Sequence, residues 1–357
     1  MKIAVAMSGG IDSTIAAILL REMGHDIIGI TANFKTGIPA DRNNPFFSEK
    51  SIEDSRAIAK QFDFPHFVKE ISDDFYHLVI DPFCREYMNG RTPNPCTHCN
   101  PLIKFKNLLE YALTLGCEKI ATGHYSQIKI SGKGRYFISR GKDPVKDQSY
   151  FLYRLSQYTL ERVLFPLGDF LKSEVRDMAL KRNLSIAHGP ESQEICFIPD
   201  NNYSEFIGKM MGTEPPPGNI VDREGNILGR HKGIHNYTIG QRRGLGIAAP
   251  HPLYVIRINA GDNTITAGFS EELETEGLVA GDINYMKATS MDDIDILVKT
   301  RSTQQPVPAH LIQDGERVRA TFVEKQKGIS PGQAAVFYDN DGGVLGGGII
   351  EKGFNAG

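Results

Sequence analysis

Near its start the chain reads Ser8-Gly9-Gly10-Ile11-Asp12-Ser13, between the apolar run of residues 2–7 and a helix-like segment at residues 14–20. The order predicts a buried strand, a tight glycine turn and a helix N-terminus. Glycine permits positive φ and close backbone approach, and backbone N–H groups at such a turn converge on an anion. This stretch therefore indicates an α/β fold with an anion-binding turn after its first strand.

The alternation continues through the first half of the chain. Strands are predicted at residues 3–7, 27–32, 66–71 and 119–122, and helices at 14–23, 52–62, 74–88, 102–115, 150–163 and 172–181. Strands that alternate with helices favour a doubly wound parallel sheet of the Rossmann-like type.

The second half has a different character. A proline-rich stretch at residues 212–218 indicates a stiff linker. Short strands separated by turn residues follow, with strands predicted at 255–259, 296–300, 317–323 and 334–338. We expect a catalytic domain at residues 1–204, a small β-rich central domain at 205–275 and a C-terminal β-barrel at 276–357.

Composition narrows the class of protein. The net charge of -3 gives no overall basic character, so any nucleic-acid contact must use local patches, for which Arg135, Arg140, Lys142 and Lys146, Arg242 and Arg243, and Lys325 and Lys327 are candidates. We find no bilayer-spanning run and no signal peptide, which predicts a cytoplasmic protein without a membrane partner. Five cysteines, an odd number, do not indicate a disulfide framework.

The opening loop lacks the Lys-Ser/Thr ending of a Walker loop and the spaced glycines of a dinucleotide fingerprint. It resembles the PP-loop of ATP pyrophosphatases, which split ATP between its α- and β-phosphates. Asp12 is either a helix N-cap or a ligand of Mg²⁺ beside the phosphates. Gly123 and, more weakly, Ala32 follow strand ends where such sheets present ligands.

Two cysteines lie in a loop expected before the helix at 102–115. Cys99 is close to that helix N-terminus, which predicts a lowered thiol pKa, and Lys104 and Lys106 add positive charge. Cys96 and Cys99 alone fit a redox pair or half of a zinc site. Cys196, Cys84 and Cys117, taken alone, fit core positions.

Ordered matches along the whole chain make it resemble the tRNA-specific 2-thiouridylases of the MnmA type. The matching stretches are residues 8–13, 90–105 (GRTPNPCTHCNPLIKF), 121–125 (ATGHY), 146–153 (KDQSYFLY), 165–168 with 172–176, 192–198 (SQEICFI), 237–246 (YTIGQRRGLG) and 331–338 (PGQAAVFY). The resemblance implies a catalytic nucleophile at Cys99 and a persulfide carrier at Cys196.

The resemblance also implies the binding sites. ATP contacts are implied at Ala6, Met7, Ser8, Gly9, Gly10, Ile11, Asp12, Ser13, Ala32 and Gly123. Contacts with tRNA or its target base are implied at Asn94, Pro95, Cys96, His124, Lys146, Asp147, Gln148, Arg301, Ser302 and Gln333, although Ser302 replaces the usual aromatic residue. ATP and Mg²⁺ are the expected cofactors, and tRNA and a persulfide-carrying sulfur-relay protein are the expected partners.

One position departs from the family. Many relatives carry Asp where this chain has Cys96, so three thiols could hold an iron–sulfur cluster with one open iron, or Cys96 could be an extra redox-active thiol. The expected reaction is ATP-dependent 2-thiolation of the wobble uridine. The alternatives are an amidating PP-loop synthetase, a different tRNA thiolase, a sulfide-dependent iron–sulfur thiolase and a non-catalytic metal- or RNA-binding module.

Overall fold

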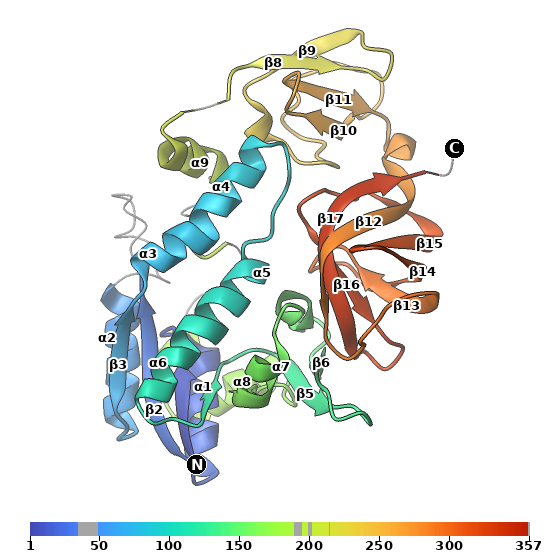
Figure 1. Cartoon of the computed structure of the whole chain (residues 1–357). Coiled ribbons are helices and arrows are strands. Elements are labelled where there is room, and N and C mark those ends of the chain that lie inside the picture. The colour runs from blue at the N-terminus through green and yellow to red at the C-terminus, as the bar shows by residue number, and fades with distance from the viewer. Residues whose placement is uncertain (35–48, 189–194, 199–201, 214, 356–357) are drawn as a thin grey trace. The chain divides into compact units, whose positions relative to one another are not determined.

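The computed structural model describes residues 1–34, 49–188, 195–198, 202–213 and 215–355. Its contacts divide the chain into two compact units. The first unit comprises residues 1–79, 95–201 and 342–344, and the second comprises residues 80–94, 202–341 and 345–357. Figure 1 shows the course of the chain through both.

The first unit is built on a parallel sheet with strand order β3-β2-β1-β4-β7. The strands are β1 (Lys2–Ala6), β2 (Asp26–Asn33), β3 (His66–Glu70), β4 (Lys119–Ala121) and β7 (Val163–Leu164). The order reverses direction at β1, which places a topological switch point between β1 and β4.

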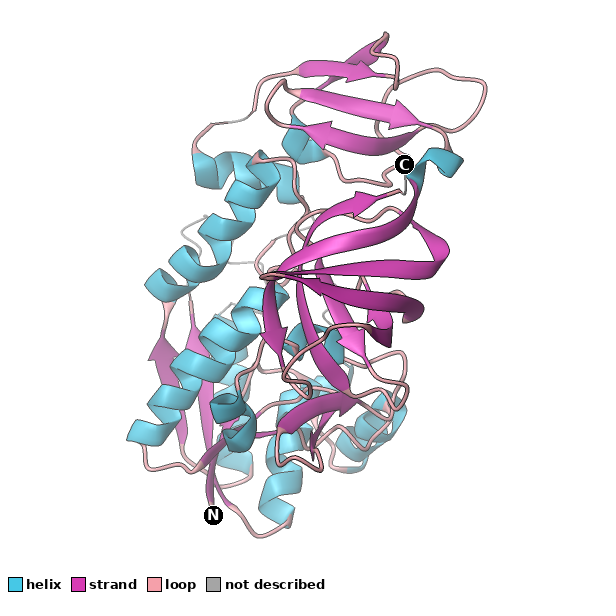
Figure 2. Ribbon diagram, turned by 45° about the vertical axis from the view of Figure 1, so that its right-hand side comes forward, coloured by secondary structure: helices cyan, strands magenta, loops and turns pink. Residues whose placement is uncertain are grey.

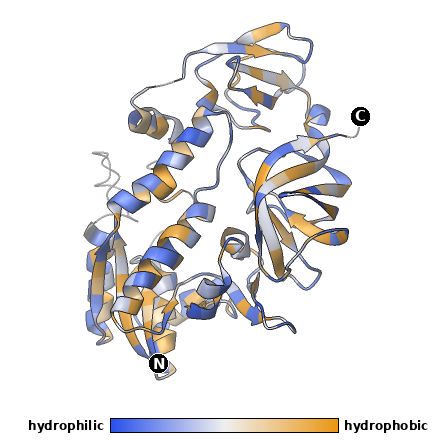
Figure 3. Cartoon of the chain, viewed as in Figure 1, coloured by the Kyte–Doolittle hydropathy of each residue, from blue (hydrophilic) through white to orange (hydrophobic). Residues whose placement is uncertain are grey.

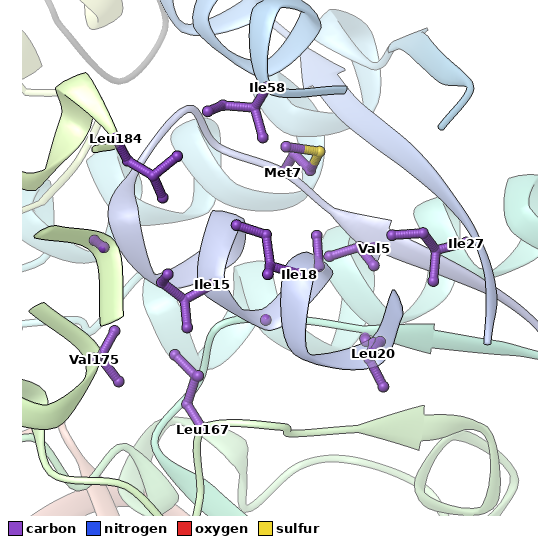
Figure 4. Packing of buried hydrophobic residues seen from close by; sticks show 14 of the residues in the cluster. Val5, Met7, Ile15, Ile18, Leu20, Ile27, Ile58, Leu167, Val175 and Leu184 are labelled. Atoms are coloured by element: carbon purple, nitrogen blue, oxygen red, sulfur yellow. The ribbon is translucent and has the colours of Figure 1, made fainter. Parts of the chain in front are cut away.

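Helices cover both faces of this sheet. The helices of the unit are α1 (Ile11–Glu22), α2 (Glu49–Gln61), α3 (Ser72–Phe75), α5 (Cys96–Cys99), α6 (Leu108–Thr114), α7 (Gln157–Arg162) and α8 (Lys172–Lys181). Figure 4 shows α1 packed among Val5, Ile58 and Val175 in a buried apolar cluster. Helix α6 contacts β1, β2 and β4 and contributes nothing to that cluster, so it covers the opposite face.

Short helical segments of other types complete the unit. They are the π-helices η2 (Tyr76–Ile80) and η3 (Asn100–Asn107) and the 3-10 helices η4 (Ser149–Leu152) and η5 (Ser185–His188). A hairpin of β5 (Ser126–Ile130) and β6 (Tyr136–Arg140) lies apart from the main sheet. The colours of Figure 3 show that α6 carries both polar and apolar residues along its length.

Two sequence predictions need correction. The single helix predicted at 150–163 is wrong: η4 ends at Leu152, and Ser156 then caps α7 by accepting from the Thr159 N–H. The chain leaves α7 as β7, a fifth strand of the sheet. The helix predicted at 102–115 begins earlier, because α5, η3 and α6 form one helical run from Cys96.

The second unit contains a small mixed sheet and a closed barrel, drawn in magenta in Figure 2. The sheet, in the order β10-β11-β8-β9, consists of β8 (Gly218–Val221), β9 (Ile227–His231), β10 (Tyr254–Asn259) and β11 (Thr264–Gly268). The unit also holds α4 (Asp81–Met88), α9 (Tyr203–Met211) and the 3-10 helices η7 (Ile234–Asn236) and η8 (Ser270–Leu273).

The barrel closes in the order β12-β15-β14-β13-β16-β17. Its strands are β12 (Glu274–Tyr285), β13 (Ile294–Lys299), β14 (Val307–Asp314), β15 (Arg317–Lys327), β16 (Ala334–Tyr338) and β17 (Val344–Phe354). The predicted fold class, a Rossmann-like sheet followed by a small β-rich part and a barrel, is confirmed. No helix in the described residues is long and apolar enough to cross a bilayer.

Candidate functional site

The turn between β1 and α1 gathers backbone and hydroxyl groups that are suited to bind an anion. Gly9 has φ +73°, and a Cβ there would lie 2.9 Å from the Ser51 carbonyl oxygen, so both conformation and space require glycine. Helix α1 has no side-chain cap, which leaves its first N–H groups to a ligand. The Ser13 hydroxyl accepts from the Ser8 N–H at 3.2 Å and lies 3.3 Å from the Ser8 hydroxyl. This is the chemistry of an anion site.

The other predicted ATP positions lie at the same sheet edge. Because β2, β1 and β4 are parallel neighbours, Ala32, Ser8 and Gly123 lie at or just beyond their carboxyl ends. A Cβ on Gly123 would lie 2.6 Å from the Asp12 carbonyl carbon and 2.7 Å from the Ser13 nitrogen. The close approach that Gly123 permits is therefore to the first turn of α1. Ala32 is half-buried and pairs with Lys69.

Asp12 has two partners that its sequence neighbourhood does not indicate. Its Oδ1 accepts from Lys172 Nζ at 2.6 Å and from the Tyr125 hydroxyl at 2.7 Å. The Lys172 side chain is only 11% exposed, whereas Asp12 is 34% exposed. Gly10 is the N-cap of α1, so the interpretation of Asp12 as an N-cap is wrong. Both contacts use Oδ1 and none is to Oδ2, and the role of this carboxylate toward Mg²⁺ stays a prediction.

Three thiols from distant parts of the chain come together in the first unit. Cys96 and Cys99 form the ends of α5, where the Cys99 N–H donates to the Pro95 carbonyl at 2.8 Å. Cys196 is near enough to both for their charges to raise its pKa, in addition to the larger effect of burial. None of the five cysteines, all of which the structure describes, forms a disulfide. The core interpretation fits Cys84 and Cys117, which are buried, but not half-buried Cys196.

The lowered thiol pKa predicted for Cys99 is wrong. Burial raises the pKa of the Cys99 thiol to about 11, and the nearby Lys104 ammonium only partly offsets this. The loop expected around Cys96 and Cys99 is also wrong, because both cysteines lie in the helical turn of α5, where they are half-buried. Desolvation raises the thiol pKa, and the dipoles of one helical turn lower it by less than burial raises it.

An iron–sulfur cluster does not fit this arrangement. Among the residues that the structure describes, which include all three thiols, no group of three or more Cys, His, Asp or Glu side chains is placed to hold a metal ion. We therefore derive no step through a cluster. A half zinc site between Cys96 and Cys99 gains no further ligand for the same reason.

Three family models match successive parts of the chain. They are the tRNA methyl transferase HUP domain over residues 1–200, the tRNA methyl transferase PRC-barrel domain over residues 204–268 and the Aminomethyltransferase beta-barrel domain over residues 275–350.

Curated relatives match over the full length. The tRNA-specific 2-thiouridylase MnmA of Geotalea uraniireducens is 45% identical, over 99% of this chain and 96% of its own. That of Geobacter metallireducens is 45% identical, over 100% and 98%, and that of Caldicellulosiruptor saccharolyticus is 44% identical, over 98% of both chains. The chain belongs to the MnmA family. The resemblance seen in the sequence is thus confirmed, as is the expectation of an enzyme of this family.

The positions that the MnmA resemblance assigns to tRNA differ in their surroundings. His124 is buried, its Nδ1 lies 2.6 Å from the Thr122 hydroxyl, and Phe105 and Phe165 pack on its ring. Burial, and then Lys104, hold the pKa of His124 well below its usual range, so the ring is neutral. Contact of RNA with His124 stays a prediction.

The segment at 146–148 is tied to its own unit. Asp147 accepts from the Gly141 and Ser149 N–H groups and lies 3.6 Å from Arg140, while Gln148 Oε1 accepts from the Tyr125 N–H. Lys146 is half-buried. These contacts brace the loop beside Tyr125, a partner of Asp12.

Of the remaining MnmA positions, Pro95 belongs to the first unit, and Asn94, Arg301, Ser302 and Gln333 belong to the second. Arg301 donates to the Gly328 carbonyl at 2.6 Å, and Gln333 Nε2 donates to the Thr92 carbonyl at 2.9 Å. Ser302 and Asn94 are half-buried, and Pro95 is buried. The contact of these residues with RNA stays a prediction.

Proposed function

We propose that this protein replaces O2 of the wobble uridine of tRNA with sulfur, at the cost of ATP cleavage to AMP and pyrophosphate. Membership of the MnmA family supports the reaction class. The observation that carries the mechanism is the approach of Cys196 to Cys96 and Cys99, which lie far from it in the sequence. Such a gathering of thiols serves sulfur transfer, and an amidating synthetase would have no use for it.

The first step activates the uridine. The C2 carbonyl of uracil is amide-like, so its oxygen is a poor leaving group. Attack of O2 on the α-phosphorus of ATP forms the O2–P bond, breaks the bond to pyrophosphate and makes AMP the later leaving group. Residues Ser8–Ser13 hold the pyrophosphate through backbone N–H groups and hydroxyls. Asp12 would hold Mg²⁺, which supplies charge neutralisation to the phosphates.

The second step transfers sulfur. A persulfide on Cys196 attacks C2 through its outer sulfur, and AMP departs. The Cys99 thiolate then attacks the Cys196 sulfur, so that the bridge breaks, 2-thiouridine leaves and a Cys99–Cys196 disulfide remains. If the outer sulfur is instead released first as hydrosulfide, the hydrosulfide attacks C2 and the same disulfide forms. An external thiol reductant must reset it. The two Cα atoms must come within about 4.4–6.8 Å.

The substrate and partners follow from this chemistry. An anticodon loop offers an unstacked base that can enter a buried site at small cost. A persulfide-carrying relay protein would load Cys196, since free sulfide does not form a persulfide on a thiol without an oxidant. A cytoplasmic location belongs to the same proposal, because the thiols must be kept reduced between turnovers.

Thiolation of tRNA in vitro, with ATP and a persulfide donor, tests the proposal. We expect Cys196→Ser and Cys99→Ser to make no 2-thiouridine, whereas buried Cys117→Ser retains the wild-type rate. Because activation precedes sulfur transfer, Cys196→Ser should still release pyrophosphate when tRNA is added. Wild-type thiolation by Cys196→Ser would exclude the relay. ATP consumption that requires ammonia and not tRNA would indicate an amidating synthetase.

A further inference from the structure

Lys104 lies among the thiols and is not explained by the site described so far. It is half-buried on η3, and its charge acts on the pKa of Cys96, Cys99 and Cys196. The other titratable group within its reach is His124, which burial keeps neutral. Among the residues that the structure describes, this ammonium group therefore faces one imidazole and three sulfur atoms, all uncharged when the thiols are protonated.

No anion in the described ranges neutralises Lys104, to which no hydrogen bond or ion pair belongs. The other lysine near the site behaves differently, since Lys172 pairs with Asp12 at 2.6 Å. A partly buried ammonium without a counter-charge loses hydration and gains nothing in return. Such a group indicates an anion that is present only during the reaction.

The helix brings Lys104 to the thiols. In a π-helix the hydrogen bonds run from residue i to residue i+5, and Lys104 is five residues after Cys99. The run of α5 and η3 therefore places the ammonium one turn along from Cys99 and on a neighbouring part of the same face. Lys106, two residues further on, is exposed.

We propose that the Lys104 ammonium is the counter-ion of the sulfur anion formed among Cys96, Cys99 and Cys196, and so a positioning residue for sulfur transfer. The inference rests on the proposed function and deepens it. One ammonium balances one sulfur anion. The persulfide anion of Cys196 is therefore present before transfer and the Cys99 thiolate after it. Each thiol gives its proton to water, and Lys104 keeps its own.

The direction in which the Cys99 pKa changes when Lys104 is replaced separates this role from a purely structural one. Removing a counter-ion about 4–6 Å from a thiolate raises the thiol pKa by about 1–3 units. Merely loosening the packing would admit water and move the pKa the opposite way, from about 11 toward the ordinary value.

The experiment is alkylation of the reduced full-length protein with iodoacetamide, an uncharged probe, over a pH series and without ATP or tRNA. Mass spectrometry resolves the rate at each cysteine. In Lys104→Met we expect the Cys99 midpoint to rise. At a pH below the midpoint, the alkylation rate should fall about three-fold for each unit by which the thiol pKa rises. The rate falls less than the thiolate fraction does, because a more basic thiolate is also more nucleophilic. Lys104→Arg should keep the wild-type profile, as should the matched control Lys106→Met.

A Cys99 midpoint in Lys104→Met that is unchanged or lower would overturn the proposal. The same holds if Lys106→Met shifts it equally. Since the probe reports on thiol ionisation alone, the result does not depend on thiolation of tRNA. Failure of the counter-ion role and failure of the proposed function are thus read from separate assays.

Discussion

At the scale of single residues, two half-buried lysines of the first unit differ in whether a carboxylate pairs with the ammonium group. Lys172 is neutralised by Asp12, while Lys104 faces uncharged groups within the described ranges. The Asp12–Lys172 pair joins the first turn of α1 to the start of α8, so it holds the phosphate-binding turn in place before ATP arrives. In the proposed function, Lys172 is the cation available to move to the phosphates of ATP.

Gly123 offers a sharp test of the phosphate-binding turn. A methyl group at 123 would meet the backbone of Asp12 and Ser13, at 2.6 Å and 2.7 Å, and backbone cannot move aside cheaply. We expect Gly123→Ala to displace the start of α1, to weaken ATP binding at least about ten-fold and to destabilise the protein by about 1–3 kcal/mol. Isothermal titration with ATP and thermal unfolding measure the two effects.

The matched control is Gly132→Ala, because Gly132 is exposed and a Cβ there meets nothing within 4 Å. This variant should bind ATP as the wild type does. Normal ATP affinity in Gly123→Ala would show that the turn does not depend on this contact.

At the scale of elements, the β2–β3 pair contains a pH-sensitive contact. His66 Nε2 lies 2.8 Å from the Thr31 hydroxyl, and its buried Nδ1 has no hydrogen-bond partner. Burial, and then Arg56, lower the pKa of His66 to about 4. Since the unfolded state takes up the proton first, near the ordinary value of 6.5, stability is present above that pH and is lost as pH falls toward about 4.

We expect protonation linked to His66 to lower the free energy of unfolding by about 2 kcal/mol between about pH 7 and pH 5. One unit of pKa difference between the folded and unfolded states corresponds to about 1.4 kcal/mol. Hydrogen exchange of the β2 and β3 amides, corrected for intrinsic rates, measures it. His66→Gln should lose most of this pH dependence, and exposed His251→Gln should keep it. An equal pH dependence in His66→Gln and the wild type would contradict the assignment.

The elements also show what sequence could predict. The runs at 3–7, 27–32 and 119–122 match β1, β2 and β4 because buried parallel strands are largely apolar. The run at 66–71 matches β3, a half-buried strand at the edge of the sheet. The two residues of β7 are too few to form a pattern. Strand β17 was not predicted because its glycines interrupt the apolar pattern of a strand. At Gly346 and Gly348 a Cβ would lie 2.3 Å and 2.6 Å from carbonyl oxygens of β12, so close strand approach requires them.

For the site, the rule that parallel strands present ligands at their carboxyl ends was enough to group Ser8, Ala32 and Gly123. It could not find Lys172, because an ion pair that spans 160 residues leaves no local pattern. The burial of Cys99 was missed for a related reason. Desolvation depends on what packs around the thiol, and nearby sequence shows only the charges of Lys104 and Lys106.

At the scale of the whole molecule, the cation clusters predicted from sequence are largely neutralised. Lys142 pairs with Glu174 and Arg140 lies near Asp147, while Lys325 and Lys327 pair with Glu276 and Glu274. Arg242 and Arg243 are exposed and form no ion pair in the described part of the chain. With a net charge of -3, RNA affinity has to come from such a local patch and from shape, not from a general field.

The barrel provides the last prediction, because it has a core of its own. Leu278, Val298, Leu311 and Phe337 are fully buried within it, and β12 pairs with both β15 and β17, so no strand edge is left open. Closure without edges and a separate core favour independent folding. We expect the fragment 274–355 to unfold cooperatively on heating, as followed by circular dichroism. The matched fragment 274–341 lacks β17, exposes the edges of β12 and β16 and should show no such transition. A cooperative transition in both fragments, or in neither, would mean that closure by β17 does not decide the stability of this part of the chain.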